Sequence, residues 1–469
     1  MTNSAQTGAP GLAAGADFTL AATAVAGYAG SPQLDRTASK VATHVGVTDY
    51  TTRLRDSTGA NAISFPAATI GTGASSATVQ YHDAGNFQVL AGGIVDNSFS
   101  VDDPSKGDCV SGSSSNADND GNANNGLVYG CNIANQGDSN LFGRFFPGYY
   151  VMAGSPAVSA ACAAGGYSYL GDAHIGLGFT ISAMSQDNPG GSTLKLSHYT
   201  SGYGTLASVN VAAENGATAT DLSGNFTPSL AYSASNWSSG DYPVSGSTYA
   251  YTRPAGAPSG PYDSLYVAAG VTDADGAALS GLDFKLGDPT CTVSCTHRKL
   301  SASPTKIRFG RLYVPNTYGT EKLDLTIPLE AQYWTGSIWA RNTLDSCTSI
   351  TTPYIVLGNH TGGLNSGNLG ASHVAVGANT GGAWTVTLAK PGPTSGTGTV
   401  DMAVYLGPAL PAAAPQICPT WTPAPGTLSG PDLDYLRGNW CGANYDKDPD
   451  GKITLGVSRS KFIFFRENY

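Results

Sequence analysis

Apolar and polar residues alternate along most of the chain, with a period of two. The stretches that follow this pattern are DFTLAATAVAG, ATVQYHDAGNFQVLAGGIV, GLGFTISAMS, DSLYVAAGVTDADG, KIRFGRLYV, LDLTIPLEAQYW, AWTVTLAK, TVDMAVYLG and KFIFFRENY. A period of two is typical of strands with one buried face, and clusters of Gly, Pro, Asn or Asp separate the stretches. Long capped segments with a period of 3.6 are absent from the sequence. The pattern predicts an all-β protein.

A weak internal repeat indicates that the strands form similar modules. DFTLAATAVAGYAG, from Asp17, resembles GFTISAMSQDNPGG, from Gly178. Each copy is a Phe-Thr-aliphatic strand followed by a turn, and the spacing suits one immunoglobulin-like β-sandwich with long loops that is repeated along the chain. A chance similarity between two strands is the alternative explanation.

Changes in composition divide the chain into three predicted β-sandwich domains, at residues 1–142, 143–295 and 296–469. The first ends in a long polar loop, PSKGDCVSGSSSNADNDGNANNGLVYGCNIANQGDSNLF, which contains Cys109 and Cys131. The stretch GDPTCTVSCTHRKLSASPTK marks the next boundary. The last domain contains a Pro-rich insertion, GPALPAAAPQICPTWTPAPG, which favours extended, polyproline-like chain.

The composition of the 469 residues narrows the class of protein further. Only 12% of the residues are charged, and the formal net charge is −10. Nucleic-acid binding requires a basic surface, and no basic run is present, so we expect no nucleic-acid partner. No apolar run is long enough to span a membrane. The first residues lack the charged and apolar regions of a signal peptide, so we expect that an export signal has been removed or lies on a longer parent chain.

The eight cysteines are widely spaced, which favours disulfides and an oxidising compartment over a zinc site. Proximity in sequence suggests three pairs, and the two remaining cysteines would then join different domains. Sequence alone leaves the connectivity open. The suggested pairs are Cys109–Cys131, Cys291–Cys295 and Cys418–Cys441, with Cys162 and Cys347 left to each other.

Catalytic motifs are largely missing. The sequence contains no G-x-S-x-G, H-E-x-x-H or G-x-x-x-x-G-K-[ST] motif, and its seven histidines are scattered singly. Two S-x-x-K spacings lack the helix and the partner motifs that this nucleophile needs. Paired carboxylates of the glycosidase type depend on spatial and not sequence proximity, so a polysaccharide hydrolase is an alternative. We expect a protein that is not an enzyme.

Three acidic turns carry alternating oxygen ligands beside a glycine, which is the pattern with which calcium loops begin. None has a Glu at the twelfth position or a flanking helix, so none is a full EF-hand, and Asp-Gly and Asn-Gly are also strong turn formers. Calcium is the candidate cofactor, and we expect no organic cofactor. The candidate ligands are Asn116, Asp118, Asp120 and Asn122 in one turn and Asp446, Asp448, Asp450 and Lys452 in another, and a third turn, DADG, begins at Asp273.

Several stretches together resemble one known family. They are GRFFPGYYVMAG, GYSYLGDAHIGLGFTISA after Cys162, VTDADG, the block from Arg308 to Ile350, LDYLRGNW and the closing DPDGKITLGVSRSKFIFFRENY. The chain resembles the C-terminal region of the MSHA-pilus biogenesis protein MshQ family, large surface proteins associated with bacterial type IV pili. Two features depart from that family: the long N-terminal part is missing here, and Asp446 and Asp450 are additions to a simpler turn.

This resemblance implies a non-enzymatic, extracellular protein of a type IV pilus system, at the pilus tip or on the bacterial cell surface, with a structural or adhesive role. Pilus subunits or other cell-surface proteins would be its partners, and a surface glycan or a host or abiotic surface would be its target. The family region brings no catalytic residues. A secreted glycan-binding module is the other alternative, and exposed, coplanar aromatic rings among Trp237, Trp334, Trp339 and Trp384 would favour it.

Overall fold

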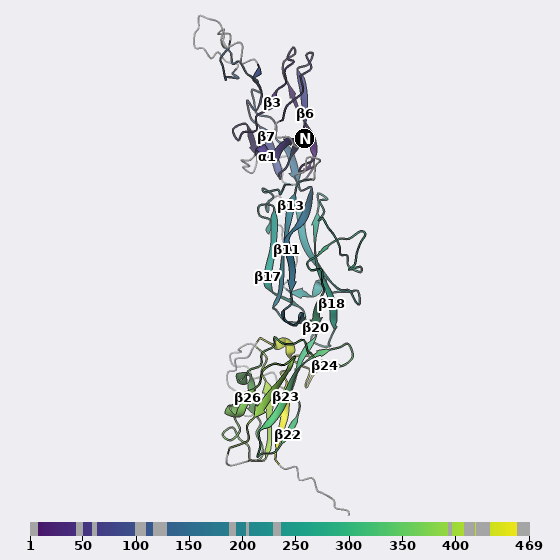
Figure 1. Ribbon diagram of the computed structural model, residues 1–469, viewed down its shortest axis with the longest axis vertical. Coiled ribbons are helices and arrows are strands. Elements are labelled where there is room, and N and C mark those ends of the chain that lie inside the picture. Colours follow the sequence, from purple (N-terminus) through teal and green to yellow (C-terminus); the bar gives the residue numbers. More distant parts are fainter. Residues whose placement is uncertain are drawn as a thin grey trace, which may run out of the picture.

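The protein is an elongated stack of three β-sandwiches in a computed structural model (Figure 1). The structure describes residues 8–43, 50–58, 63–98, 109–115, 129–186, 194–202, 206–227, 236–392, 396–407, 418 and 432–456. We name the units the N-terminal sandwich (β1 to β10), the middle sandwich (β11 to β20) and the C-terminal sandwich (β21 to β29). The predicted fold class, all-β with tandem immunoglobulin-like sandwiches and disulfide-closed loops, is confirmed.

The C-terminal sandwich shows the strand arrangement most fully. One sheet has the order β21-β23-β27-β26 with β24 beside β23, and the other has the order β22-β29-β28-β25. These correspond to strands A-B-E-D and C-F-G of an immunoglobulin-like domain, with β22 added in parallel to the last strand. The strands are β21 (Gly310–Tyr313), β22 (Thr317–Gly319), β23 (Leu325–Trp334), β24 (Trp339–Arg341), β25 (Ile355–Gly358), β26 (Val374–Val376), β27 (Ala383–Leu388), β28 (Gly398–Val404) and β29 (Asp450–Leu455).

The middle sandwich repeats this topology with longer strands. Its sheets have the orders β11-β13-β17-β16 and β12-β20-β18-β14-β15, with β19 beside β18, and β12 again runs parallel to the last strand, β20. The strands are β11 (Tyr149–Ser159), β12 (Tyr167–Tyr169), β13 (Ile175–Met184), β14 (Ala207–Asn215), β15 (Thr220–Asp221), β16 (Phe226–Thr227), β17 (Asp241–Tyr251), β18 (Tyr262–Asp273), β19 (Arg298–Lys299) and β20 (Thr305–Arg308).

The N-terminal sandwich has the same plan in a reduced form. Its sheets have the orders β1-β10-β7-β4 and β2-β6-β5, and a small third sheet contains β3-β8-β9. The strands are β1 (Leu12–Ala13), β2 (Asp17–Thr23), β3 (Gln33–Leu34), β4 (Val41–Thr43), β5 (Leu54–Asp56), β6 (Ala74–Tyr81), β7 (Gly85–Val89), β8 (Ile94–Asp96), β9 (Ile133–Ala134) and β10 (Phe142–Phe146). The single α-helix in the described residues is α1 (Tyr50–Arg53), which is one turn long.

The short helical segments elsewhere are single 3₁₀ turns. They are η4 (Ser223–Asn225), η6 (Thr352–Tyr354), η7 (Ala371–His373) and η8 (Asp434–Leu436). In the described part of the chain, no helix is long and apolar enough to span a bilayer.

The period-two pattern explains which side chains form the core. In β13, Ile175, Leu177, Phe179 and Ile181 all lie inside the sandwich, while the residues between them are half-buried. The two copies of the internal repeat, which include Phe18 and Phe179, are the corresponding strands β2 and β13, each the second strand of its sandwich in the immunoglobulin order.

The last strand of each sandwich leads almost directly into the first strand of the next. Only two residues separate β10 from β11, and only Phe309 separates β20 from β21. Strand β10 crosses the predicted boundary at 142, and β20 lies beyond the predicted boundary at 295, because each of these strands follows the polar loop that marks the boundary in the sequence. Consecutive sandwiches are therefore joined by strands that almost meet, and not by a long linker.

Candidate functional site

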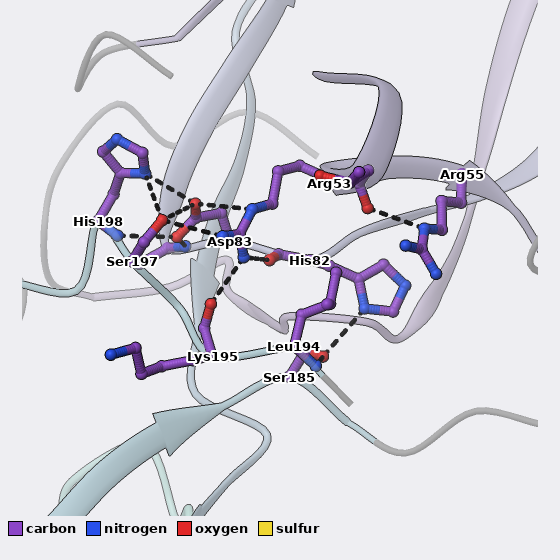
Figure 2. A network of polar contacts seen from close by, with 11 residues as sticks. Arg53, Arg55, His82, Asp83, Ser185, Leu194, Lys195, Ser197 and His198 are labelled. Carbon is purple, nitrogen blue, oxygen red and sulfur yellow. Dashed lines mark hydrogen bonds and ion pairs between the residues drawn. The ribbon is translucent and has the colours of Figure 1, made fainter. Parts of the chain in front are cut away.

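Two groups of buried polar side chains in the described residues lie at the joints between the sandwiches. Figure 2 shows the first joint, where Asp83 of the N-terminal sandwich faces a loop of the middle sandwich. The Asp83 carboxylate is fully buried, accepts a hydrogen bond from the backbone N–H of His198 at 3.1 Å, and lies 2.7 Å from Nδ1 of the same residue. The Ser197 hydroxyl donates to it at 3.2 Å.

Arg53, at the end of α1, binds the same loop from the side (Figure 2). Its Nη1 donates to the Lys195 carbonyl at 2.6 Å and its Nη2 donates to the Ser197 hydroxyl at 3.0 Å. Its Nε lies 3.6 Å from the Asp83 carboxylate. One cation and one anion of the N-terminal sandwich thus hold a single loop of the middle sandwich.

His82 is a second contact across this joint. The residue is 2% exposed, with Nδ1 3.0 Å from the Ser185 hydroxyl and Nε2 3.2 Å from the Gln80 side-chain oxygen. Burial, followed by the positive charges of Arg55 and Arg53, lowers the pKa of His82 to about 4. The side chain is therefore neutral at physiological pH.

The turn that contains DADG also serves this joint. Asp275 forms an ion pair with Arg144 of β10, in which Nη1 donates to Oδ2 at 2.8 Å. Asp273 accepts a hydrogen bond from the Tyr150 hydroxyl at 2.8 Å, and burial raises the pKa of Asp273. The acidic side chains of this turn are thus engaged by an arginine and a tyrosine.

The second joint is built around Arg253, in the loop between β17 and β18. Its guanidinium donates to three backbone carbonyls, those of Tyr445 at 2.8 Å, Gly310 at 2.9 Å and Arg437 at 2.7 Å. It also lies over the Phe309 ring, 4.2 Å from the centroid. Burial lowers the pKa of Arg253 to about 10, so the group stays charged at neutral pH. A residue of the middle sandwich thus binds three separate segments at the start and end of the C-terminal sandwich.

A disulfide and a polar network close the other side of this joint. Cys162 of the middle sandwich is bonded to Cys347 of the C-terminal sandwich. Beside it, the Tyr169 hydroxyl donates to the Asp345 carboxylate at 3.0 Å and accepts from the Asn342 amide at 2.7 Å. The two large apolar cores continue across the joints. One includes residues of the N-terminal and middle sandwiches, and the other joins Tyr167 and Tyr169 of the middle sandwich to residues of the C-terminal sandwich.

All four disulfides have the connectivity that the spacing of the cysteines suggested. They are Cys109–Cys131, Cys162–Cys347, Cys291–Cys295 and Cys418–Cys441. Because all eight cysteines are paired, the folded chain belongs to an oxidising, extracytoplasmic compartment.

The acidic turn before β29 does not gather its side chains around one point. Asp448 is fully buried and accepts a hydrogen bond from Nε of Arg437 at 2.9 Å, whereas Asp446 lies at the surface near Lys447. The Lys452 ammonium lies 3.7 Å from Asp401, and burial raises the pKa of Asp450. The predicted calcium ligands at 446–452 are therefore dispersed, because the chain has already entered a strand at Asp450.

The other predicted calcium turn, with Asn116, Asp118, Asp120 and Asn122, lies outside the described residues. Within the part of the chain that the structure describes, no three His, Cys, Asp or Glu side chains come together as a metal site. Calcium binding at 116–122 stays a prediction, tested by a rise in melting temperature that EDTA reverses.

The four tryptophans singled out in the sequence, Trp237, Trp334, Trp339 and Trp384, do not form the flat platform typical of glycan-binding surfaces. Trp237 and Trp384 are buried in the cores, and the half-buried rings of Trp334 and Trp339 meet at 60°. Sequence reasoning missed a cavity of about 330 Å³ beside the second joint, where the Asp172 carboxylate and the His174 Nδ1 lie 2.7 Å apart. Burial raises the pKa of Asp172, and Asp432 lines the same cavity. This arrangement can hold a small polar molecule.

Comparisons with known proteins place most of the chain in one family. Residues 121–297 match the third domain of DUF6701, and residues 308–468 match its fourth domain. No curated protein matches the chain.

Solved structures of titin fragments are among those similar to it. They are the I9–I11 tandem (6% identity, TM-score 0.23, covering 95% of this chain and 94% of that one) and the I67–I69 fragment (9% identity, TM-score 0.24, with the same coverage). The two matched stretches together cover more than half of the chain, so the protein contains the third and fourth domains of DUF6701.

Proposed function

We propose that the chain is a non-enzymatic, rigid stalk on the outside of a bacterial cell, as a structural or adhesive component of a type IV pilus system. The observation that supports a rigid stalk is the structure of the two joints. Strand runs into strand at both, and the Arg253 contacts lock the second. A linker that works as a hinge has few contacts across it, whereas these joints contain buried charges, continuous cores and a disulfide.

The pilus part of the proposal rests on the resemblance to the MshQ family, and the extracytoplasmic site rests on the paired cysteines. Under this proposal, pilus subunits or other surface proteins are the partners at the ends of the stalk, and the loops meet the surface that is recognised. A rigid stalk suits this role because it keeps two binding ends at a fixed distance.

Small-angle X-ray scattering of the full chain tests the stalk directly. We expect one extended conformer whose maximum dimension is that of the three stacked sandwiches in Figure 1. A distribution of bent conformers would contradict the rigid stalk.

Fractionation of cells tests the pilus assignment separately. We expect the protein in sheared pili or on the outer surface, and loss of surface attachment when it is deleted. A protein that stays with the cells when the pili are sheared, and whose deletion leaves attachment unchanged, would contradict the pilus role but not the rigid stalk. Release of sugars from a polysaccharide would instead support the hydrolase alternative.

A further inference from the structure

In the part of the chain that the structure describes, the N-terminal sandwich has an open sheet edge, whereas both of the other sandwiches cover the corresponding edge with a strand. In the middle sandwich β11 pairs with β13, and in the C-terminal sandwich β21 pairs with β23. The strand of the N-terminal sandwich that corresponds to β13 and β23 is β2, which lies at the end of the order β2-β6-β5. Among the described residues, no strand pairs with the outer edge of β2.

The hydrogen-bond pattern shows which backbone groups face this open edge. Strand β2 runs antiparallel to β6 in a register without shifts, and Ala24 N–H, just after β2, donates to the Gly73 carbonyl on the β6 side. Because backbone groups alternate between the two sides of a strand, residues 18, 20 and 22 face β6 as well. The backbone N–H and C=O groups of Thr19, Ala21 and Thr23 therefore point outward.

An apolar groove runs beside the open edge. It has a volume of about 270 Å³ and no charged side chain among the residues that line it. It lies between β2 and the chain around β8, β9 and β10, and its walls include Leu20, Ala22, Tyr28, Ile94, Ile133 and Phe142. Ile133 is 42% exposed, and Val25, which follows β2, is 79% exposed. Large apolar side chains thus meet solvent next to unpaired backbone groups.

The sequence of β2 lacks the features that protect free sheet edges. Natural edge strands are interrupted by Pro, a bulge or an inward-pointing charge, or they are covered. DFTLAAT contains none of these interruptions, and its only charge, Asp17, accepts a hydrogen bond from the Gln80 side chain at 2.6 Å. An edge of this kind is typical of a site of strand addition.

We propose that β2 accepts an extended, uncharged strand of a partner polypeptide, which lies antiparallel to β2 and fills the groove. The two sister sandwiches show the geometry, since β11 and β21 both cover the corresponding edge in an antiparallel register. The groove determines which side chains the partner strand carries. Its uncharged lining accommodates alternating small and apolar side chains and excludes charged ones. This docking surface does not depend on the proposed function.

The test uses the full chain and a synthetic peptide with the sequence of β11, YYVMAGSPAVS. This peptide is the chain's own strand for the corresponding edge, where Tyr149 to Ala153 pair with Met184 to Thr180. Hydrogen exchange is measured for the outer amides of Thr19, Ala21 and Thr23. We expect these amides to exchange rapidly in the protein alone and at least about tenfold more slowly with saturating peptide.

Two variants at one position separate the backbone contact from the side chain. Ala21→Pro removes an outward N–H without breaking a bond to β6, so we expect an unchanged melting temperature and loss of peptide binding. Ala21→Leu keeps the N–H, and we expect it to retain binding.

Three results would overturn the proposal. In the first, millimolar peptide gives neither protection nor a change in fluorescence anisotropy. In the second, the outer amides are already protected in the isolated monomer, which means that the chain covers its own edge. In the third, protection rises with protein concentration together with a dimer in light scattering, which makes a second copy the occupant.

Discussion

Replacement of Arg253 by Met should uncouple the C-terminal sandwich from the middle one. The guanidinium donates three charge-assisted hydrogen bonds across the second joint, and each such bond contributes about 1.5–3 kcal/mol. Its contact with the Phe309 ring adds about 1 kcal/mol. Met retains the apolar stem, and a loosened joint allows water to reach the three carbonyls. The net loss should therefore be smaller than this sum, about 3 kcal/mol of interdomain coupling.

Scanning calorimetry and small-angle scattering measure this loss together. We expect wild-type middle and C-terminal sandwiches to unfold in one transition, and the variant to show an earlier, separate one. We also expect small-angle scattering of the variant to show a broader distribution of molecular dimensions than that of the wild type. Arg341→Met is the matched control, because Arg341 of β24 has an exposed side chain, and this change should alter neither measurement. A variant with unchanged cooperativity and a stability loss below about 1 kcal/mol would refute the assignment of Arg253 as the lock of this joint.

Three further predictions follow from groups at or near the joints. The folded pKa of His82, about 4, lies below its unfolded value near 6.5, so its contribution to the free energy of unfolding is complete above pH 6.5 and declines by roughly 3 kcal/mol as the pH falls to 4, measured by urea unfolding. Replacing Cys162 and Cys347 by Ser opens a loop with a sequence separation of 185 and lowers unfolding stability by up to about 5 kcal/mol, measured by calorimetry. Asp448→Ala leaves the Arg437 guanidinium without its carboxylate and lowers the free energy of unfolding by about 3 kcal/mol, measured by urea unfolding. Added calcium should not restore the lost stability.

Each of these predictions has a control. His82→Asn should flatten the acid side of the stability profile, and a profile unchanged by this substitution would show that other groups cause the loss. Replacing Cys291 and Cys295 by Ser opens a separation of only 4 residues, so the loss should be clearly smaller than for the pair across the joint. Rescue of Asp448→Ala by calcium would restore the metal interpretation of the turn.

The strands could be predicted from the sequence because burial of one sheet face leaves a local signal. Leu177, Phe179 and Ile181 alternate with half-buried residues, and any single window of the chain reveals that period. The disulfide connectivity was also within reach, because most cysteines bond to a near neighbour in sequence. Neither inference requires knowledge of how distant segments pack.

The joints could not be predicted, since their contacts are long-range. Asp83 and His198 are 115 residues apart, and the partners of Arg253 are backbone carbonyls, which every residue carries. The acidic turn shows a related limit: its spacing of aspartates is local, but the partner of Asp448 is decided by the fold. A usable signal did exist in the composition. In a chain with 12% charged residues, an isolated Arg beside an aromatic strand is a candidate for a buried contact.

The bond between Cys162 and Cys347 also determines how a pulling force travels along the protein. A force applied at the two ends passes from β11 through the sulfur atoms and leaves in the C-terminal sandwich. The 185-residue separation between the two cysteines is then excluded from extension, and at about 3.4 Å per residue this removes roughly 600 Å of chain that would otherwise lengthen. Most strands of the middle sandwich therefore carry no tension while the bond is intact. Reduction of this one covalent bond would add that segment to the length of chain that a pulling force can extend.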